Sequence, residues 1–115
     1  MRVLILEDDP LIAMDLQMIV EGCGHEVVGP CETIACAVRH LGTEFDLAFL
    51  DVDLPDGKSF DLARKLEAKR VPFIFVSAST RQDLPDGLRN ACFIAKPYGH
   101  AAIRRSLEQV LSIAA

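Results

Sequence analysis

The sequence predicts one α/β domain built on a five-stranded parallel sheet. Short apolar runs alternate with helical patterns five times along the 115 residues, and half of all residues are hydrophobic. Strands that alternate with helices are typical of parallel sheets, whose right-handed crossovers place helices on both faces. The length suits a single compact domain. We therefore expect residues 1–115 to form one domain with no output domain attached.

Five apolar runs have the length and composition of buried strands. Each is short and rich in Val, Ile, Leu or Phe, as expected for strands covered on both faces. Pro30 cannot donate a hydrogen bond to a neighbouring strand, so the run that contains it either lies at an edge of the sheet or ends there. The predicted strands span residues 2–6, 25–31, 46–50, 72–78 and 92–95.

The first two helices are marked by capping residues. Pro10 suits the first position of a helix over residues 10–22, and Asp9 directly before it suits the N-cap. Thr33 can cap a second helix that reaches about Leu41, before a glycine. Both helices therefore have a defined beginning in the sequence.

The remaining segments are predicted from their apolar stripes and turn residues. Residues 53–59 are turn-forming and precede the third helix. Residues 79–91 are polar and contain Pro85 and Gly87, so a fourth helix there is expected to be short or irregular and the segment mobile. The C-terminal tail reads as an amphipathic helix. The stripes are Leu62, Ala63 and Leu66 in the third helix and Ile103, Leu107, Val110 and Ala114 in the last.

The charge balance and hydropathy exclude several classes of function. The chain has 17 acidic and 12 basic residues and a net charge of -5, which argues against direct binding of nucleic acid. No apolar run reaches the roughly 20 residues that span a bilayer. The first ten residues, MRVLILEDDP, turn acidic too early for a signal peptide. We expect a cytoplasmic protein without membrane contacts.

The cysteines and histidines show no ligand spacing. No two cysteines form a CxxC pair, and no histidine lies at zinc-finger spacing from them. We expect all four cysteines to be free and to pack as small hydrophobic residues, and the histidines to lie on the surface. The cysteines are Cys23, Cys31, Cys36 and Cys92, and the histidines are His25, His40 and His100.

The reactive side chains collect where the predicted strands end. In open α/β sheets, binding sites form beyond the carboxyl ends of the strands, which lie together at one edge. An acidic cluster, a hydroxyl and a lysine are all expected at that edge. They are Glu7, Asp8 and Asp9 after the first strand, Asp51 and Asp53 after the third, Ser77 at the end of the fourth and Lys96 after the fifth.

The carboxylates of this acidic cluster need a compensating positive charge. Two unit charges about 4 Å apart repel by roughly 4 kcal/mol at an effective dielectric constant near 20, so gathered carboxylates need protons or a cation. Mg²⁺ accepts one or two carboxylates, waters and phosphate oxygens as ligands. An aspartate can also act as a nucleophile and form an aspartyl phosphate. Lys96 would offset the charge of a transferred phosphoryl group.

Four motifs in this order resemble the receiver domain of response regulators, of the chemotaxis-regulator type. They are LILEDDP, FLDVDLPDG, FIFVSAS and AKPY, and the resemblance covers the whole chain. It implies a flavodoxin-like, doubly wound sheet with strand order 2-1-3-4-5. It also implies that Asp51 is the phosphoacceptor and that Mg²⁺, or Mn²⁺, is the cofactor. The metal ligands would be Asp8, Asp51, the backbone carbonyl of Asp53 and, mainly through a water, Glu7.

The same resemblance assigns roles at the fourth and fifth strands. Ser77 would bond the phosphoryl group, Lys96 would pair with its oxygens, and Ser77 and Phe93 would form the switch. The Lys96–Pro97 bond would be cis, a conformation nearly confined to X–Pro bonds. Two of these residues have a simpler interpretation. Ser77 would then be a strand-end hydroxyl bonded to backbone, and Phe93 a core residue.

The resemblance also implies the partners. The phosphoryl group would come from a histidine kinase or a histidine phosphotransfer protein, and the output would be contacts with a downstream protein. The domain would catalyse only its own phosphorylation and dephosphorylation and would not be an enzyme otherwise. Several apolar residues of the first helix would suit a homodimer face or plain burial. They are Leu11, Ile12, Ala13, Met14, Met18, Ile19 and Val20.

Three other functions are compatible with parts of the sequence. Asp51-Val52-Asp53 resembles the DxD of haloacid-dehalogenase-like phosphatases, in which Asp53 would serve as general acid and base. A flavodoxin-like nucleotide binder is a weaker alternative, because residues 7–9 would repel a phosphate. The third is a receiver-like binding module that is not phosphorylated. Capping of the first helix alone would explain the acids at 7–9 but not Asp51 and Lys96.

Overall fold

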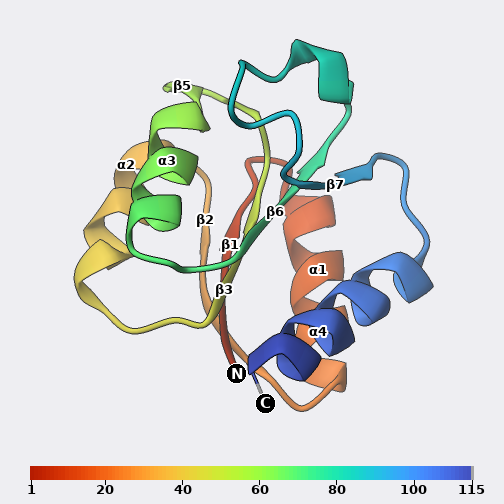
Figure 1. The fold of residues 1–115 in the computed structure, drawn as a ribbon. Coiled ribbons are helices and arrows are strands. Elements are labelled where there is room, and N and C mark those ends of the chain that lie inside the picture. Colours follow the sequence, from red (N-terminus) through yellow and green to blue (C-terminus); the bar gives the residue numbers. More distant parts are fainter. Residues whose placement is uncertain (115) are drawn as a thin grey trace.

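A five-stranded sheet forms the centre of the molecule in a computed structural model, which describes residues 1–114. The strands are β1 (Arg2–Leu6), β2 (Glu26–Cys31), β3 (Leu47–Leu50), β6 (Phe73–Ser77) and β7 (Cys92–Ala95). Their order is β2-β1-β3-β6-β7, and all neighbouring strands are parallel (Figure 1). The predicted α/β class and flavodoxin-like strand order are confirmed, and each predicted strand is met within one residue at either end. The strand that contains Pro30 lies at the edge of the sheet and ends one residue later, so both predicted alternatives are met.

Helices cover both faces of this sheet. Helices α1 (Pro10–Gly22) and α4 (His100–Ala114) lie on one side, and α2 (Ile34–Arg39) and α3 (Phe60–Ala68) lie on the other (Figure 1). The predicted caps are present: Asp9 Oδ1 accepts a hydrogen bond from the Leu11 amide at 2.9 Å, and Thr33 Oγ1 accepts one from the Cys36 amide at 3.1 Å. Helix α2 ends before the predicted Leu41 and tightens into the 3₁₀ turn η1 (His40–Gly42).

The core consists of two apolar layers, one on each side of the sheet. Successive residues of β1 alternate between them, with Leu4 and Leu6 in the layer under α2 and α3, and Val3 and Ile5 in the layer under α1 and α4. All four side chains are at most 1% exposed. Burying each such side chain contributes about 1.5–3 kcal/mol to the stability of the fold. The position of the residues that directly follow β1 is therefore well fixed.

The stretch after β3 contains a small hairpin where the sequence predicts only turns. Strands β4 (Asp53–Leu54) and β5 (Gly57–Lys58) pair in antiparallel fashion, and Gly57 has a φ of 134° that favours glycine. Asp56 lies at the tip, and its two carboxylate oxygens accept hydrogen bonds from the amides of Ile34 and Ala35 at 2.9 and 3.1 Å. The hairpin therefore ties the segment after Asp51 to the beginning of α2.

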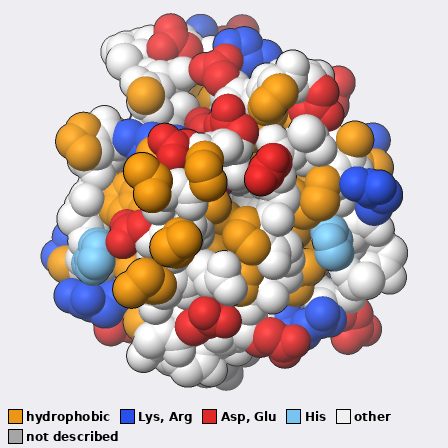
Figure 2. Space-filling view, turned by 180° about the vertical axis from the view of Figure 1, so that it is seen from behind, with side chains coloured by type: hydrophobic (Ala, Val, Ile, Leu, Met, Phe, Trp, Pro, Cys, Tyr) orange, Lys and Arg blue, Asp and Glu red, His pale blue; other side chains and the backbone are white. Residues whose placement is uncertain are grey.

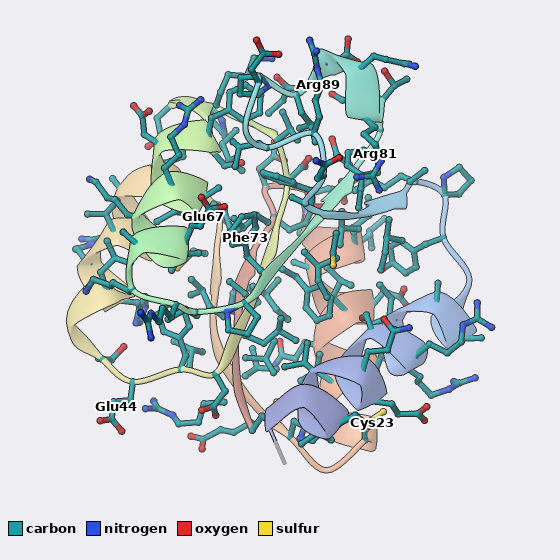
Figure 3. The ribbon with its side chains drawn as sticks, in the orientation of Figure 1. Cys23, Glu44, Glu67, Phe73, Arg81 and Arg89 are labelled. Atoms are coloured by element: carbon teal, nitrogen blue, oxygen red, sulfur yellow. A yellow bond between two sulfur atoms is a disulfide. The ribbon has the colours of Figure 1, made fainter. Side chains whose placement is uncertain are left out.

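The segment between β6 and β7 contains no α-helix, which confirms the predicted irregularity. One 3₁₀ turn, η2 (Arg81–Asp83), is its only helical element. Leu84 and Leu88 anchor it in the core at 1% exposure each. The Arg81 guanidinium donates to the carbonyls of Arg89 and Ala91, and Arg89 Nε donates to the carbonyl of Leu84 (Figure 3). Hydrogen bonds from these two arginine side chains thus hold the backbone of the segment in place of a regular helix.

We expect fast amide hydrogen exchange in this segment. Its backbone hydrogen bonds are isolated turns, such as Leu84 to Arg81 and Leu88 to Pro85, and not a continuous ladder. Opening of residues 79–91 should therefore require at least about 2 kcal/mol less free energy than opening of β3. Hydrogen exchange followed by mass spectrometry measures both free energies. Protection across 79–91 equal to that of β3 would contradict the predicted mobility of the segment.

The prediction of four free, packed cysteines is wrong. Cys31, the last residue of β2, forms a disulfide with Cys36 in the first turn of α2, with Cα atoms 5.5 Å apart. The tight turn between strand and helix brings the two side chains together at a span that suits a disulfide. Cys23 and Cys92 are free but exposed. Of the histidines, His100 is exposed, while His25 and His40 are half-buried.

Helix α1 divides its apolar residues between the core and the surface. Ala13, Leu16, Ile19 and Val20 are buried. Leu11, Met14 and Met18 are 76%, 58% and 65% exposed. Figure 2 shows hydrophobic side chains gathered on the rear face of the molecule. Burial therefore explains only part of the apolar surface of this helix. Among the described residues, no helix has the length and hydropathy needed to cross a bilayer.

Candidate functional site

Two buried carboxylates meet where β1 and β3 end. Glu7 follows β1 and is 1% exposed, and Asp51 follows β3 and is 7% exposed. The Asp51 amide donates to the Leu6 carbonyl at 2.9 Å, which continues the pairing of the two strands and fixes the two acids side by side. Asp8, the next residue after Glu7, is exposed. One carboxylate oxygen from each of Glu7, Asp8 and Asp51 lies within 4.8 Å of the other two.

Lys96 closes this acidic cluster from the end of β7. Its Nζ lies 2.5 Å from Glu7 Oε1 and 3.1 Å from Asp51 Oδ2. The Lys96 amide donates to the Ser77 carbonyl at 2.9 Å, which extends the pairing of β6 and β7 by one residue. The Lys96–Pro97 bond is cis, as predicted. The structure therefore brings together Glu7, Asp8, Asp51 and Lys96 from three separate strands, as the sequence predicts.

Burial and the neighbouring charges shift the pKa values of Glu7 and Lys96. Burial raises the pKa of Glu7 to about 7, although the hydrogen bonds from Lys96 and from the Asp9 amide act in the opposite direction. For Lys96, burial favours a lower pKa, but its hydrogen bonds to Glu7 and Asp51 outweigh burial and raise the pKa. Lys96 is therefore a permanent cation, and Glu7 is the group that titrates near neutral pH.

The Asp51 side chain and backbone are both fixed. Asp51 Oδ1 accepts a hydrogen bond from the Val52 amide at 2.8 Å, while Oδ2 faces Lys96. The hydroxyl of Ser59, fully buried before α3, donates to the Asp51 carbonyl at 2.5 Å. A carboxylate held in this way needs little reorganisation to present an oxygen to a ligand.

The donor set fits a hard divalent cation. Glu7, Asp8 and Asp51 supply only carboxylate oxygens, which Mg²⁺ and Mn²⁺ prefer over nitrogen or sulfur. Asp8 lies on the solvent side, so that a cation could reach the cluster while retaining waters. A cation there would also favour the ionised form of Glu7, whose pKa is raised mainly by burial.

Asp53 directs its side chain away from the cluster. The carboxylate pairs with Lys58 across the hairpin and accepts a hydrogen bond from the Ser79 hydroxyl at 3.2 Å. These contacts, the Lys58 bond first, hold the pKa of Asp53 below its ordinary value. The Asp53 carboxylate is therefore engaged outside the cluster, and the carbonyl role that the resemblance implies for this residue stays a prediction.

Ser77 and Phe93 make their side-chain contacts outside the cluster. Ser77 is 1% exposed, and its hydroxyl oxygen accepts a hydrogen bond from the Ser79 amide at 3.2 Å. Within residues 1–114 it makes no hydrogen bond to Asp51. Phe93 is half-buried against the core layer under α3, and the guanidinium carbon of Arg81 lies 5.7 Å from the centre of its ring. Both residues thus adopt the simpler arrangement that the sequence also allows.

Sequence reasoning missed a network around Asp15. The Tyr98 hydroxyl donates to Asp15 Oδ2 at 2.7 Å, and His100 Nε2 lies 3.0 Å from Asp15 Oδ1. Burial and the Asp15 contact raise the pKa of Tyr98. These contacts fasten the loop after Lys96 to α1. Asp15 is one of two charged residues in the apolar pattern of this helix, with Glu21, but its position alone does not identify a partner.

Comparison with known proteins decides the family. A family model described as the response regulator receiver domain matches residues 3–108. The chain belongs to this family. Receiver domains of this kind are the signalling modules of two-component systems, and the predicted resemblance is therefore confirmed.

Individual receiver proteins agree with this assignment. The Phyllosphere-induced regulator PhyR of Methylorubrum extorquens is 38% identical over 96% of this chain and 43% of its own length. The non-phosphorylated HemR receiver domain from Leptospira biflexa superposes with a TM-score of 0.81 at 33% identity, covering 96% of this chain and 94% of that one.

A mutant of the anti-anti-sigma factor PhyR from Bartonella quintana superposes with a TM-score of 0.84 at 31% identity. That match covers 98% of this chain and 49% of the Bartonella chain. The receiver chain described here spans less than half of the length of the curated relatives that it matches.

Proposed function

We propose that this receiver domain accepts a phosphoryl group on Asp51 in a reaction that depends on Mg²⁺ or Mn²⁺. One observation carries the proposal: Lys96 Nζ lies 3.1 Å from Asp51 Oδ2 while Glu7 and Asp8 complete a cluster of carboxylates. A nucleophilic carboxylate, a cation site and a fixed ammonium group are the parts that phosphoryl transfer to aspartate requires.

The proposed reaction uses each of these groups in turn. An oxygen of Asp51 attacks the phosphorus of a phosphohistidine on the donor, an O–P bond forms, and the N–P bond breaks. The electron pair of that bond stays on the imidazole, which takes up a proton. Lys96 moves its ion pair from the carboxylates to the phosphoryl oxygens. A cation bound at the cluster would offset the charge on those oxygens. Its proposed ligands are Asp8, Asp51, the Asp53 carbonyl and, through a water, Glu7.

We also propose a switch at the ends of β6 and β7. The Ser77 hydroxyl leaves the Ser79 amide, which it now contacts at 3.2 Å, and donates to a phosphoryl oxygen. Phe93 then turns inward from its half-buried position beneath Arg81. New charge at Asp51 would thereby change the surface around Arg81. Hydrolysis of the acyl phosphate restores the original state.

The proposed partners are proteins. A histidine kinase or histidine phosphotransfer protein supplies the phosphoryl group, and a downstream protein reads the result. The exposed Leu11, Met14 and Met18 on α1 offer an apolar surface for docking or for a homodimer. The similar Bartonella quintana protein is described as an anti-anti-sigma factor, so a regulator of sigma-factor activity is one class of downstream partner.

The other candidate functions have less support. A haloacid-dehalogenase-like phosphatase needs the Asp53 carboxylate as general acid and base, but Lys58 and Ser79 engage that carboxylate outside the cluster. A nucleotide-binding loop after β1 would have to accept phosphate next to Glu7 and Asp8. A receiver-like binding module would have the same fold and the same cluster but would not be phosphorylated on Asp51. The experiment below distinguishes it from the proposal.

The test is intact-mass spectrometry after incubation with acetyl phosphate. The wild type with Mg²⁺ is expected to gain a single phosphoryl group, whereas Asp51→Asn and the wild type with a chelator gain none. The matched control is Asp61→Asn, which removes an exposed carboxylate on α3 and should gain the group normally. Repeated hydrolysis of a generic phosphomonoester would instead support the phosphatase. A wild type unmodified by acetyl phosphate and by a panel of histidine kinases would favour the non-phosphorylated binding module.

A further inference from the structure

A second cluster of possible metal ligands lies on the α2 side of the sheet. A ring nitrogen of His40 and the sulfur atoms of Cys31 and Cys36 lie within 4.8 Å of one another. Cys31 is fully buried, while Cys36 and His40 are half-buried. None of these three residues takes part in the Asp51 cluster.

We propose that Cys31, Cys36 and His40 bind one Zn²⁺ when the disulfide is reduced. Two thiolates and an imidazole are ligands that Zn²⁺ prefers, and the half-buried side of the cluster leaves a fourth position for water. The oxygen-only cluster at Asp51 suits Mg²⁺, so the two sites select different ions by the softness of their donors.

The local backbone holds the three ligands in a suitable arrangement. Cys36 and His40 are four residues apart along α2 and η1, so that their side chains lie on the same face, opposite Cys31 at the end of β2. In a tetrahedral zinc site the ligand atoms lie about 3.5 Å apart, given Zn–S distances of about 2.3 Å and Zn–N distances of about 2.0 Å. Once the disulfide is reduced, rotation of the three side chains is expected to bring the cluster to this geometry.

Hydrogen bonds fix the backbone of each ligand. The Cys31 carbonyl accepts from the Glu7 amide at 2.9 Å, and the Cys36 amide donates to Thr33 Oγ1 at 3.1 Å. The His40 carbonyl accepts from both the amide and the hydroxyl of Thr43, at 2.9 and 2.7 Å. The backbone of the three ligands is thus held in place, so that only their side chains would have to move when a metal binds.

Disulfide formation and zinc binding exclude each other. An external dithiol reduces the disulfide: it gives up two electrons and two protons, the S–S bond breaks, two thiols form, and the reductant becomes a disulfide. Zn²⁺ then displaces one proton from each thiol, and both protons leave to the solvent. A small-molecule disulfide, such as oxidised glutathione, reverses the exchange and releases the ion. The site is therefore occupied only in the reduced protein.

The test is a zinc titration of the full chain against a chromophoric chelator. The reduced protein is desalted without oxygen and titrated in excess Mg²⁺, which keeps zinc away from the carboxylates. The wild type is expected to bind one Zn²⁺. Cys36→Ser should weaken binding at least about 100-fold and His40→Gln about 10-fold. Cys23→Ser/Cys92→Ser, which removes the two exposed free thiols, is the matched control and should bind as the wild type does.

Two further measurements make the result unambiguous. Co²⁺ in place of Zn²⁺ is expected to give a thiolate-to-metal charge-transfer band in the wild type that decreases in Cys36→Ser. Circular dichroism checks that each variant is folded. The proposal is overturned if folded, reduced wild type takes up no Zn²⁺, if folded Cys36→Ser binds as tightly as the wild type, or if oxidised protein binds as tightly as reduced protein.

Discussion

Lys96→Ala is expected to slow phosphoryl transfer from acetyl phosphate to Asp51 by about 100-fold, the typical effect of removing one preorganised charged donor from a transition state. Lys96 Nζ already lies within hydrogen-bond distance of Asp51, and it is only 13% exposed. An ammonium group in so enclosed a place interacts with a new phosphoryl charge far more strongly than one in water. The rate follows from the growth of the phosphorylated mass over time at saturating Mg²⁺.

The matched control for this variant is Lys65→Ala. It removes the same charge from an exposed position on α3 and should leave the rate within about twofold of the wild type, since exposed charges are screened. A Lys96→Ala rate within about threefold of the wild type would show that transfer does not need this ammonium group. Lys96 would then be a structural partner of Glu7 alone.

Metal-free protein is expected to lose stability as the pH rises from 5 to 8, and Glu7 is the cause. Burial raises its folded-state pKa to about 7, above the ordinary value of 4.5 that applies to the unfolded chain. Between these two values the folded state holds a proton that the unfolded state has released, so the free energy of unfolding falls with rising pH. The total loss is at most about 3 kcal/mol and levels off above pH 7.

Urea unfolding of wild type and Glu7→Gln at several pH values measures this loss. The variant cannot ionise, so its curve should lack the decline, and the difference between the curves isolates Glu7. The comparison is needed because His25, whose pKa burial lowers, makes the folded state gain stability as the pH rises through 6.5. Glu67→Gln, on the exposed surface of α3, is the control. Equal slopes for wild type and Glu7→Gln would contradict the assignment. Added Mg²⁺ should reduce the decline, because it favours the ionised carboxylate.

Sequence reasoning predicts the sheet and the main site because both depend on local patterns. The run RVLIL is apolar throughout, so it must be covered on both faces, and the acids directly after it must lie at the edge of the sheet. The same logic applies to Asp51 and Lys96. Caps at Asp9 and Thr33 are similarly local, because a capping side chain bonds an amide two or three residues away.

The features that the sequence did not predict depend on contacts between distant segments or on turn geometry. Asp56 accepts a hydrogen bond from the first amide of a helix that begins 22 residues earlier. The local sequence DLPDG is equally typical of an ordinary turn, so it does not reveal this contact. The disulfide requires the exact path of the chain between Cys31 and Cys36, which no spacing rule supplies. Ser59 likewise looks like a simple cap, yet its hydroxyl bonds the backbone of Asp51.

The attachment of the loop after Lys96 to α1 has a consequence for partner binding. Asp15 contacts Tyr98 from that loop and His100 from the start of α4, and it lies on the helix that exposes Leu11, Met14 and Met18. A protein that docks on this helix and reorients the Asp15 side chain would weaken its hydrogen bond with Tyr98. This bond is the tether between α1 and the loop, and it lies two residues from Lys96. If phosphorylation of Asp51 repositions Lys96, as we propose, thermodynamic linkage makes the effect reciprocal, and phosphorylation changes the affinity for that protein by the same factor. We therefore expect partner binding on α1 and phosphorylation of Asp51 to be coupled through this tether.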